Sequence, residues 1–587
     1  MPDTLDTVKA AWPMLSRALK SGQLFRPQCK LVAPHPDIQC GYDVEVPIGA
    51  GVVLTCNVFR SRSRLETGEA DPVVMCAHPY DNHLTPALGK TPLGGPPQQY
   101  RLIPQAEGIP EFSTLTSWEA PDPNFWVPAG YTLVNLNLPG YANSGGEAGL
   151  VSAKQGEDYY AAIKWVAGQN WCDGNVGLTG VSYLAISQYH VAVAAAADGE
   201  ESPLKCISPW EGLSDLYRDV ACRGGVNDVG FLNFWWHTEV KETLNNPRET
   251  FADREGGLPQ ELLSVHPLFN DYWAGKAVDF EKIRMPMLVC GSFSDHELHT
   301  PGSFRAFEEA RSTRKWVYTH RSGKWTAFYS EEVKALVRDF MDHFLKGRSN
   351  RFDDLQPVRL EVRSSRDDIK EVRWEDSWPL PDTEYRPLFL SANGLVVEPP
   401  NASAELGYST QGGSASFDFI FDRDTELSGY MKVRLWVEAR AQREGAACPD
   451  DMILCVFLDK RDRQGNSVRF NGAVGSSDDM VTRGYLRISR RDLDTDRSKD
   501  WLPVLRGDTE RKLTDGEIAP VDIAFCPSST FFAAGEGLRL IVSPTEIVHA
   551  PIFRKDTSLN FGKHVLHFGG EYDSHLLVPV VIQHERY

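Results

Sequence analysis

The pattern of apolar and polar residues in the first half of the chain predicts buried strands that alternate with helices. Residues 72–80 and 130–138 are almost continuously apolar, as strands covered on both faces should be. Residues 156–169 then carry apolar side chains at helical spacing, and a short strand at 175–180 is followed by a helix from Tyr183. This succession is typical of an α/β fold with a doubly wound, mostly parallel sheet.

The alternation breaks between residues 208 and 280, where tryptophan, phenylalanine and glycine residues are frequent. We interpret 208–280 as a helical cap inserted over the sheet. The earlier pattern then resumes, with strands at 285–295 and 315–320 and helices at 303–311 and 330–347. The α/β core is therefore expected in two parts, one on either side of the cap.

The Pro-rich, polar segment at 376–387 marks a domain boundary, because helical periodicity largely disappears after it. The apolar segments beyond it are short and separated by polar turns, which is typical of a β-sandwich or jelly roll. The expected domains are an N-terminal extension at 1–40, core segments at 41–207 and 281–375, the cap at 208–280, the linker at 376–387 and a C-terminal jelly-roll β-sandwich at 388–587.

Composition narrows the classes of partner. With 587 residues and a net charge of −19, we expect a multi-domain protein that binds neither nucleic acid nor membranes, because both need clustered Lys and Arg. The first residues lack the positive charge of a secretory signal and no apolar run approaches ~18 residues, so we expect a cytoplasmic protein. Eleven scattered cysteines without a C-x-x-C pair support neither a disulfide framework nor a zinc ribbon. The oligomeric state is left open, a homo-oligomer included.

Ser182 lies at a position that suits a catalytic nucleophile. It follows the strand at 175–180 and opens the next helix, and Gly180 stands two residues before it. A nucleophile elbow needs such a strand-to-helix turn with small flanking residues, although Leu184 replaces the second glycine of G-x-S-x-G. The alternative is a serine that only caps the N-terminus of a buried helix.

A nucleophilic serine also needs a histidine base and a carboxylate that orients it. In α/β-hydrolases these follow the serine along the chain, the acid first and the histidine second. Asp295 and His320 each end a predicted strand downstream of Ser182. Because side chains at the carboxyl ends of parallel strands converge over the sheet, we expect the three residues to meet. Taken singly, Asp295 is equally well read as a turn aspartate and His320 as a surface histidine.

Longer segments of the chain resemble one family of hydrolases. They are "HPYDN" (78–82), "GYTLVNLNLPGYANSGGE" (130–147), "WCDGNVGLTGVSY" (171–183) and "GGEYDSHLLVPVV" (569–581). In addition, "GVSYLA" (180–185) resembles the G-x-S-Y-x-G signature of the cocaine esterase/X-Pro dipeptidyl-peptidase (CocE/NonD) hydrolases. The resemblance covers about residues 40–587 and implies an α/β-hydrolase domain, a helical cap and a C-terminal jelly roll.

The resemblance also implies roles for particular residues. Ser182 would be the nucleophile, Asp295 the orienting acid and His320 the base. The oxyanion hole would consist of the backbone N–H of Tyr183 and the hydroxyl of Tyr80, both directed at the oxygen that becomes negative in the tetrahedral intermediate. The family's chemistry implies no cofactor.

The chain departs from the family pattern at several positions. Asn137 and Pro139 stand where the family usually has Asp and Arg, which removes an expected ion pair but no catalytic group. Ala185 replaces the family's glycine.

The catalytic histidine departs as well, because the family's usual Pro-Trp motif is missing before His320. His296 and His299 are therefore alternatives for the base. We expect His320, because a histidine close to Asp295 in sequence is poorly placed to connect that carboxylate to the nucleophile.

The segment "HPYDNH" could also be read as a set of metal ligands, namely His78, Asp81 and His83. Their spacing matches no strong zinc signature, so we expect no metal and interpret the segment as a loop that positions Tyr80.

Four aromatic residues in the cap suit either core packing or the wall of an acyl pocket. These residues are Phe231, Phe234, Trp235 and Trp236. Core packing is the simpler interpretation. If the four side chains instead face the active site, they favour a substrate with an apolar or aromatic acyl group.

The sequence thus predicts a cofactor-independent serine hydrolase that cleaves an ester or amide of a small molecule through an acyl-enzyme on Ser182. We favour an ester over a peptide, because no cluster of carboxylates for an amine is evident in the sequence. An acyltransferase with the same three residues is one alternative. A non-catalytic binding protein that retains the fold is the other.

Overall fold

The computed structural model describes residues 29–89, 100, 109–245, 263–473, 476–547 and 552–582, together with residues 8, 9, 12, 16 and 19. The chain divides into two compact units. Unit 1 comprises residues 1–216, 232–265 and 271–357, and unit 2 comprises residues 217–231, 266–270 and 358–587. None of the described helices is long and apolar enough to cross a membrane.

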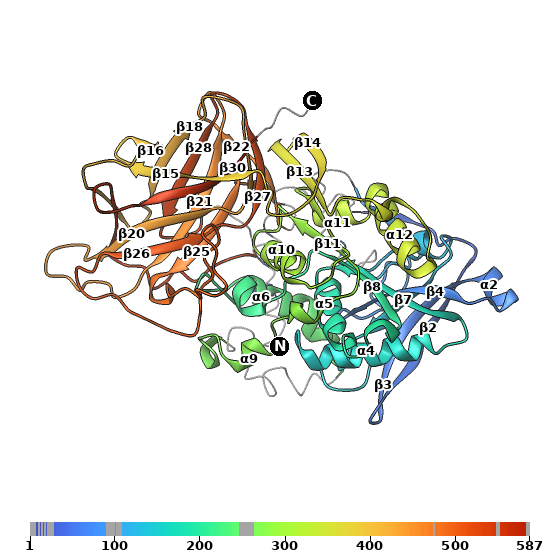
Figure 1. The fold of residues 1–587 in the computed structure, drawn as a ribbon. Helices are drawn as coiled ribbons and strands as arrows, with labels where there is room; N and C mark the ends of the chain where they lie inside the picture. The colour runs from blue at the N-terminus through green and yellow to red at the C-terminus, as the bar shows by residue number, and fades with distance from the viewer. Residues whose placement is uncertain are drawn as a thin grey trace. The chain divides into compact units, whose positions relative to one another are not determined.

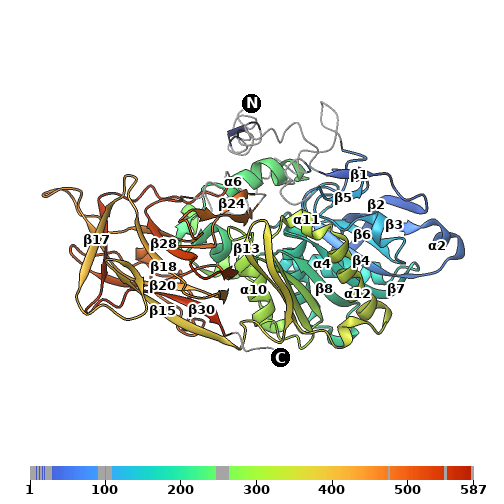
Figure 2. The same ribbon diagram turned by 90° about the horizontal axis from the view of Figure 1, so that it is seen from above.

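Unit 1 is built on one mixed sheet, seen in Figure 1 and from above in Figure 2. Its strand order is β2 (Ile38–Gly49), β3 (Val52–Ser61), β6 (Thr132–Asn137), β4 (Asp71–His78), β7 (Cys172–Val181), β8 (Leu204–Trp210), β11 (Met287–Ser292) and β12 (Lys315–His320). The pairs β2–β3 and β3–β6 are antiparallel, and all later pairs are parallel. The doubly wound α/β prediction is confirmed, and the buried apolar runs are strands at the centre of the sheet.

Helices cover this sheet: α4 (Ala153–Ala167), α5 (Tyr183–Ala195), α10 (Thr300–Glu309), α11 (Lys324–Phe328) and α12 (Glu331–Lys346). Ser330 caps the N-terminus of α12 by accepting a bond from Val333 N–H, and Gly347 ends the helix in the left-handed conformation. Helices α4 and α5 pack closely at Gly156, where a Cβ atom would lie 2.5 Å from the carbonyl oxygen of His190. In Figure 1, strands β8, β7 and β4 run between α12 and α4.

The other described elements that lie wholly or mostly in unit 1 are short. They are β1 (Lys30–Val32), α2 (Arg62–Thr67), β5 (Glu111–Ser113), α3 (Pro123–Trp126), η3 (Gly199–Glu201), α6 (Phe231–Trp235), η5 (Trp236–Val240), η6 (Lys241–Thr243), α9 (Asp271–Ala274), η7 (Phe280–Lys282) and η8 (Arg351–Asp353).

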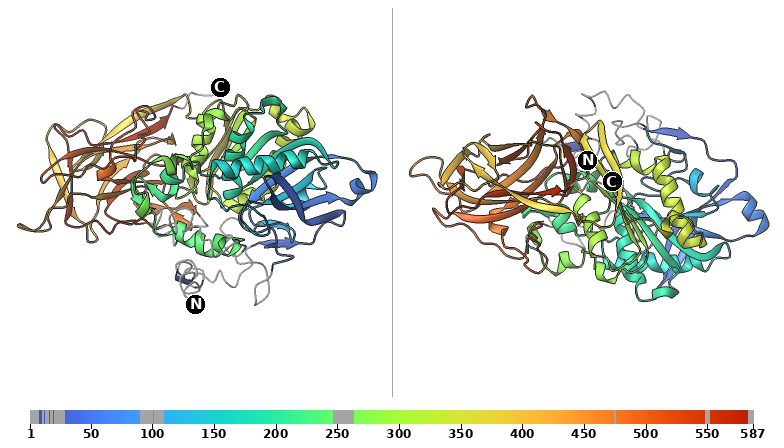
Figure 3. Two further views of the ribbon diagram at one scale, coloured as in Figure 1. Left: turned by 90° about the horizontal axis from the view of Figure 1, so that it is seen from below. Right: turned by 45° about the horizontal axis from the view of Figure 1, so that its top comes forward.

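Unit 2 is rich in antiparallel strands, coloured yellow to red in Figure 3. One sheet contains β18 (Ala415–Ile420), β28 (Gly537–Ser543), β21 (Ile453–Arg461), β22 (Ser467–Val468) and β25 (Thr482–Arg487). The other strands include β15 (Thr383–Ser391), β16 (Gly394–Val396), β17 (Ala404–Ser409), β19 (Thr425–Gly429), β20 (Lys432–Arg440), β26 (Ala519–Ala524), β27 (Ser528–Phe532), β29 (Lys563–Phe568) and β30 (His575–Val581). Apolar residues of both groups of strands share one core, as in the expected sandwich.

The smaller elements of unit 2 are η4 (Tyr217–Ala221), β9 (Cys222–Arg223), β10 (Val226–Asn227), β13 (Val358–Ser365), β14 (Asp368–Glu375), β23 (Phe470–Gly472), β24 (Ser476–Asp479) and η10 (Ile488–Arg490).

The division between the units differs from the expected boundaries in two respects. Residues 217–231 and 266–270 of the expected cap belong to unit 2. The long C-terminal segment of unit 2 begins at Val358, before the expected linker at 376–387. It begins there because β13 pairs with β14 and, at Arg363, with Thr530 of β27. Strand β14 has a mostly exposed, polar surface, so its sequence did not distinguish it from a connecting segment.

Candidate active site

Ser182 stands at the sharp turn between β7 and α5. Its backbone has φ 60° and ψ −116°, a strained conformation for a residue with a Cβ atom. The turn is fixed by bonds from Ser182 N–H to Trp210 O (3.1 Å) and from Val181 N–H to Glu119 O (3.2 Å). Gly180 is required here, because a Cβ atom on it would lie 2.6 Å from the Cβ of Leu184. The side chain of Ser182 makes no helix-capping hydrogen bond, which argues against the capping alternative.

His299 lies beside the Ser182 hydroxyl. The distance between Ser182 Oγ and His299 Nε2 is 3.3 Å, and that between His299 Nδ1 and Asp295 Oδ2 is 2.5 Å. Asp295 and His299 are both about 1% exposed. A serine, an imidazole and a carboxylate connected in this order form the arrangement of a catalytic triad.

The expectation that His320 would contact Ser182 is therefore wrong. His320 Nε2 lies 3.1 Å from Glu211 Oε1, and its ring stacks on Trp210. The sequence argument against His299 failed because the chain curls after β11. The carbonyl oxygen of Asp295 accepts bonds from the N–H groups of Leu298, His299 and Thr300, which brings the side chains at positions 295 and 299 together. The reserve candidate His296 is buried as well, but only His299 among the three histidines contacts Ser182 in the described hydrogen bonds.

The buried ammonium group of Lys324, the first residue of α11, completes this cluster. Lys324 Nζ lies 2.8 Å from Asp295 Oδ2 and 3.1 Å from His299 Nδ1. Burial alone would raise the pKa of Asp295, but Lys324 and His299 hold it below its usual range. Burial and the Lys324 charge lower the pKa of His299, which favours the neutral imidazole that a general base requires.

Tyr80, Tyr183 and Trp235 lie together next to the elbow. Trp235 Nε1–H donates to the Tyr80 hydroxyl at 3.1 Å, so the hydroxyl hydrogen of Tyr80 is available for another acceptor. The Tyr183 hydroxyl accepts from Val151 N–H and donates to Gln155 Oε1, and its ring stacks on Trp235. As the first residue of α5, Tyr183 directs its backbone N–H out of the helix N-terminus.

Two acidic residues with raised pKa values lie near these tyrosines. Burial raises the pKa of Glu119 to about 8 and that of Glu239 to about 7. Glu119 Oε1 accepts from Trp325 Nε1 at 3.1 Å, whereas its Oε2 has no hydrogen-bond partner among the described residues. Burial, with the charges of Glu119 and Glu239, raises the pKa of Tyr80 and keeps its hydroxyl protonated.

The four aromatic candidates of the expected cap separate in the structure. Trp235 touches Tyr80 and Tyr183, as described above. Phe234 and Trp236 are buried, and Phe231 stacks on Phe553 within unit 2. Trp235 is thus connected, through its described contacts, to Tyr183, the residue that follows Ser182.

The "HPYDNH" segment positions Tyr80. His78 Nδ1 accepts from the backbone N–H of Tyr80 at 3.2 Å, and burial lowers the pKa of His78 to about 4. His83 pairs with Asp43 at 2.8 Å, and Asp81 accepts from the backbone N–H of His83. His78, Asp81 and His83 therefore have different partners.

In the part of the chain that the structure describes, two fully buried groups bring potential metal ligands within 4.8 Å of one another. They are Glu211, Cys290 and His320, and Glu211, Asp295 and His299. Hydrogen bonding accounts for both. His320 Nδ1 accepts from Ser322 N–H, so its Nε2 carries the proton and donates to Glu211. In the second group Lys324 already supplies a positive charge at the carboxylate. We therefore assign neither group to a metal.

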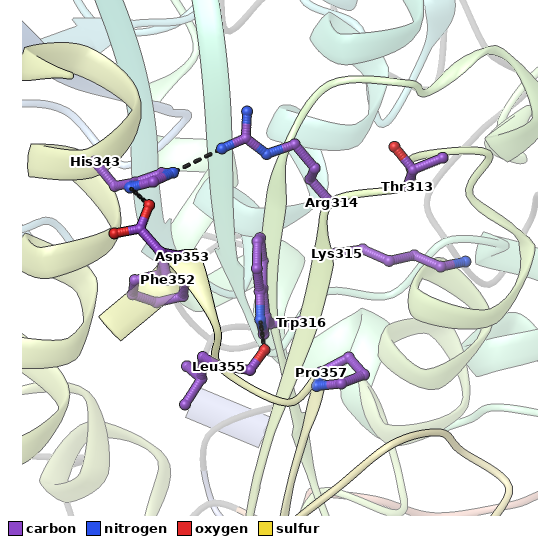
Figure 4. Close-up of a pocket in the computed structure, with 9 residues that line it drawn as sticks. All are labelled: Thr313, Arg314, Lys315, Trp316, His343, Phe352, Asp353, Leu355 and Pro357. Atoms are coloured by element: carbon purple, nitrogen blue, oxygen red, sulfur yellow. Dashed lines mark hydrogen bonds and ion pairs between the residues drawn. The ribbon is translucent and has the colours of Figure 1, made fainter. Parts of the chain in front are cut away.

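A separate pocket of about 380 Å³ lies where β12 begins. Figure 4 shows that Arg314 and His343, which both line it, are joined by a hydrogen bond and that Asp353 pairs with His343. Ser182, Asp295 and His299 follow the carboxyl ends of parallel strands, whereas this pocket lies at the amino end of β12. The pocket therefore takes no part in the cluster.

Sequence reasoning missed Lys324, Glu211 and Glu119. Glu211 directly follows β8, as Ser182 follows β7, and that position at the carboxyl end of a strand was a usable signal. Glu119 lies in a connecting segment and Lys324 opens the five-residue helix α11, and in neither place does periodicity mark a side chain as buried.

Comparisons with known proteins agree with this arrangement. Residues 50–326 match the model of the X-Pro dipeptidyl-peptidase (S15) family, and residues 350–577 match that of the X-Pro dipeptidyl-peptidase C-terminal non-catalytic domain. The two matched segments meet close to the division between unit 1 and unit 2.

Individual proteins are similar over much of the chain. A solved structure of a CocE/NonD family hydrolase from Staphylococcus aureus is 33% identical, covers 95% of this chain and all of its own, and superimposes with a TM-score of 0.83. The cocaine esterase of Rhodococcus sp. (strain MB1 Bresler) is 24% identical over 434 residues, which are 65% of this chain and 67% of that protein. An α-amino acid ester hydrolase structure, 15% identical and covering 94% of this chain and 98% of its own, shares the fold with a TM-score of 0.66.

Proposed function

Because this chain belongs to the CocE/NonD family and is a serine hydrolase, we propose that it cleaves small esters or amides with Ser182 as nucleophile, His299 as base and Asp295 as orienting acid. One observation carries the assignment of the base. The contacts from Ser182 Oγ to His299 Nε2 and from His299 Nδ1 to Asp295 Oδ2 are continuous, whereas His320 is bound to Glu211.

Acylation begins when His299 Nε2 accepts the hydroxyl proton of Ser182 and Oγ attacks the carbonyl carbon of the substrate. Tyr80 O–H and the backbone N–H of Tyr183 donate to the oxygen that becomes negative. The imidazolium of His299 then gives its proton to the leaving alcohol or amine, and Ser182 retains the acyl group. Water, deprotonated by the same imidazole, releases the acid and restores the serine.

The substrate class we propose is an ester with an apolar or aromatic acyl group. The rings of Tyr80, Tyr183 and Trp235 support this, because they pack against one another and Tyr183 directly follows the nucleophile. The hydroxyl of Tyr183 is occupied by Gln155 and Val151, so its ring offers mainly an apolar face.

Labelling with a fluorophosphonate and hydrolysis of p-nitrophenyl esters test the assignment. Ser182→Ala should lose labelling, and His299→Ala should reduce the labelling rate by ~10³-fold or more, because the hydroxyl loses its base. His320→Ala should retain most of the labelling, with a loss below about tenfold. His343→Ala is a matched control, since His343 lies on α12 and bonds to Arg314 and Arg348.

The opposite ranking, with His320→Ala inactive and His299→Ala active, would move the base to His320. No labelling of well-folded wild-type protein would contradict the proposed function. A series of p-nitrophenyl esters with acyl groups from acetyl to benzoyl measures the acyl preference, and kcat/KM should rise with apolar size.

A further inference from the structure

Lys324 places a full positive charge against the base of the proposed triad. Its Nζ lies 3.1 Å from His299 Nδ1 and 2.8 Å from Asp295 Oδ2, and the residue is 6% exposed. The proton on His299 Nδ1 is donated to Asp295 at 2.5 Å, so the lysine acts on the imidazole as a nearby charge. A cation in this position opposes formation of the imidazolium that acylation requires.

Glu211 supplies the compensating negative charge. Its carboxylate lies within 4.8 Å of the ligand atoms of Asp295 and His299, and the residue is fully buried. His320 holds it in place, because His320 Nδ1 accepts from Ser322 N–H and the proton on Nε2 is therefore donated to Glu211 Oε1. The backbone of Glu211 has φ 54°, so its position just after β8 is fixed by the fold at some cost in strain.

The charges around His299 therefore balance as they would with a single aspartate. Asp295 and Glu211 contribute two negative charges and Lys324 one positive charge. Together these three groups carry one net negative charge. Proton transfer from Ser182 to His299 then takes place next to the same net charge as in a triad with one carboxylate.

Other ionisable groups act on this cluster from neighbouring elements. Glu119 lies before α3 and Glu239 on η5, and both interact electrostatically with Lys324. Burial by itself lowers the pKa of Lys324, but Asp295, Glu211 and Glu119 raise it overall, so the ammonium group stays charged. Of these three glutamates, only Glu211 has a carboxylate oxygen within 4.8 Å of the ligand atoms of both Asp295 and His299 in the described part of the chain.

We propose that Lys324 and Glu211 are a matched pair of positioning residues that act in opposite directions on His299 and set the pH range in which it works as the base. This inference rests on the proposed function, because it assumes that His299 deprotonates Ser182. Lys324 also fixes Asp295 by its direct contact, whereas Glu211 acts through its charge.

Three variants test the pair through the pH dependence of kcat/KM for p-nitrophenyl acetate. In Lys324→Met, two carboxylates remain around His299, so the imidazole binds its proton more tightly and the acid limb should move up by about 1–3 pH units. In Glu211→Gln, the ammonium is left with one carboxylate, and the acid limb should move down. The double variant should return the limb to within about half a unit of the wild type, as expected when two opposite charges are removed together.

Matched controls separate charge from folding. Lys324→Arg keeps the positive charge and should keep the wild-type acid limb. Lys346→Met removes another mostly buried lysine of unit 1, one that pairs with Asp342 and stacks on Tyr131, and should leave the limb unchanged. Circular dichroism and fluorophosphonate labelling at pH 9, above all expected limbs, identify variants that are folded and retain a reactive serine.

Shifts of the two single variants in the same direction, or no shift in either, would overturn the proposal. If a single variant fails to fold, the remaining single variant and the double variant still decide it, because only opposing charges restore the limb in the double variant. Failure of the proposed function would look different: His299→Ala would keep its labelling at every pH.

Discussion

Strain at Ser182 is the clearest conflict between a residue and its surroundings. The positive φ of 60° costs free energy that a glycine at the same position would not. Ser182→Gly should therefore raise the free energy of unfolding by about 1 kcal/mol relative to Ser182→Ala, while both variants lose labelling. Calorimetry of the two variants measures the difference, and equal stability would show that the turn is unstrained.

Glu119 predicts a dependence of stability on pH. Burial raises its pKa in the folded chain to about 8, from an ordinary value of 4.5. The folded state then binds more protons than the unfolded state, so stability is greatest below about pH 4.5 and falls as the pH rises to about 8. Glu119→Gln removes this loss and should be more stable than the wild type at pH 8.5, by up to about 4 kcal/mol, and nearly equal at pH 4.5.

Urea unfolding at the two pH values measures this difference. Glu66→Gln, on the exposed face of α2, is the control and should show the same difference from the wild type at both pH values. A constant difference for Glu119→Gln as well would mean that folding does not raise the pKa of Glu119.

At this scale the sequence located part of the site. Ser182 and Asp295 follow buried strands, and such positions are visible as the ends of apolar runs. His299 is only an alternative in the sequence, because its contact with Asp295 depends on a backbone turn. The hydrogen bonds of that turn join backbone atoms, so the residue types do not reveal them. Lys324 could not be predicted, since a buried charge is recognisable only once its partners are in place.

Among the elements, helix α10 positions His299, which directly precedes its first turn. Thr300 Oγ1 donates to Ser292 O at 2.7 Å, which ties the start of the helix to β11 directly after His299. Thr300→Val removes this bond without changing the shape of the side chain. We expect a loss of stability of about 1–2 kcal/mol and a labelling rate at least several-fold lower, because His299 is less well positioned.

The matched control is Thr179→Val on β7. Thr179 is also buried, but its Oγ1 has no hydrogen-bond partner among the described residues. Its replacement by valine should be neutral or slightly stabilising. Equal effects of the two substitutions on the labelling rate would contradict a specific role for the Thr300 bond.

The elements themselves were largely predictable in the first half of the chain. Strands β4, β6, β7, β11 and β12 coincide with apolar runs, since they are buried on both faces. Strand β14 was not recognised, because its exposed residues lack the alternation that a half-buried strand shows.

At the scale of the whole molecule, unit 2 includes residues 217–231, a part of the chain far in sequence from its main segment at 358–587. Val226 of β10 is buried in a cluster with Ile453, Phe457 and Tyr485, and Asp228 pairs with Lys555. The sequence suggested a cap over residues 208–280, because composition does not reveal which core an apolar residue joins.

This arrangement predicts that a mutation in β10 will destabilise unit 2 and leave unit 1 unaffected. Val226→Ala should cost about 2 kcal/mol and speed hydrogen exchange in β21 and β25, while β7 of unit 1 keeps its protection. Hydrogen exchange followed by mass spectrometry measures both. Val372→Ala, at an exposed position of β14, should change neither, and faster exchange confined to β7 in Val226→Ala would contradict the assignment to unit 2.

The turn that holds Asp295 and His299 has a consequence for how this enzyme can change. The proposed acid and base, Asp295 and His299, lie on one five-residue stretch of chain, so one short segment supplies both. With His299 as the proposed base, the end of β12 does not have to supply it. A laboratory selection for new substrates can vary that strand end while leaving proton transfer intact, provided that Lys324 and Glu211 change together.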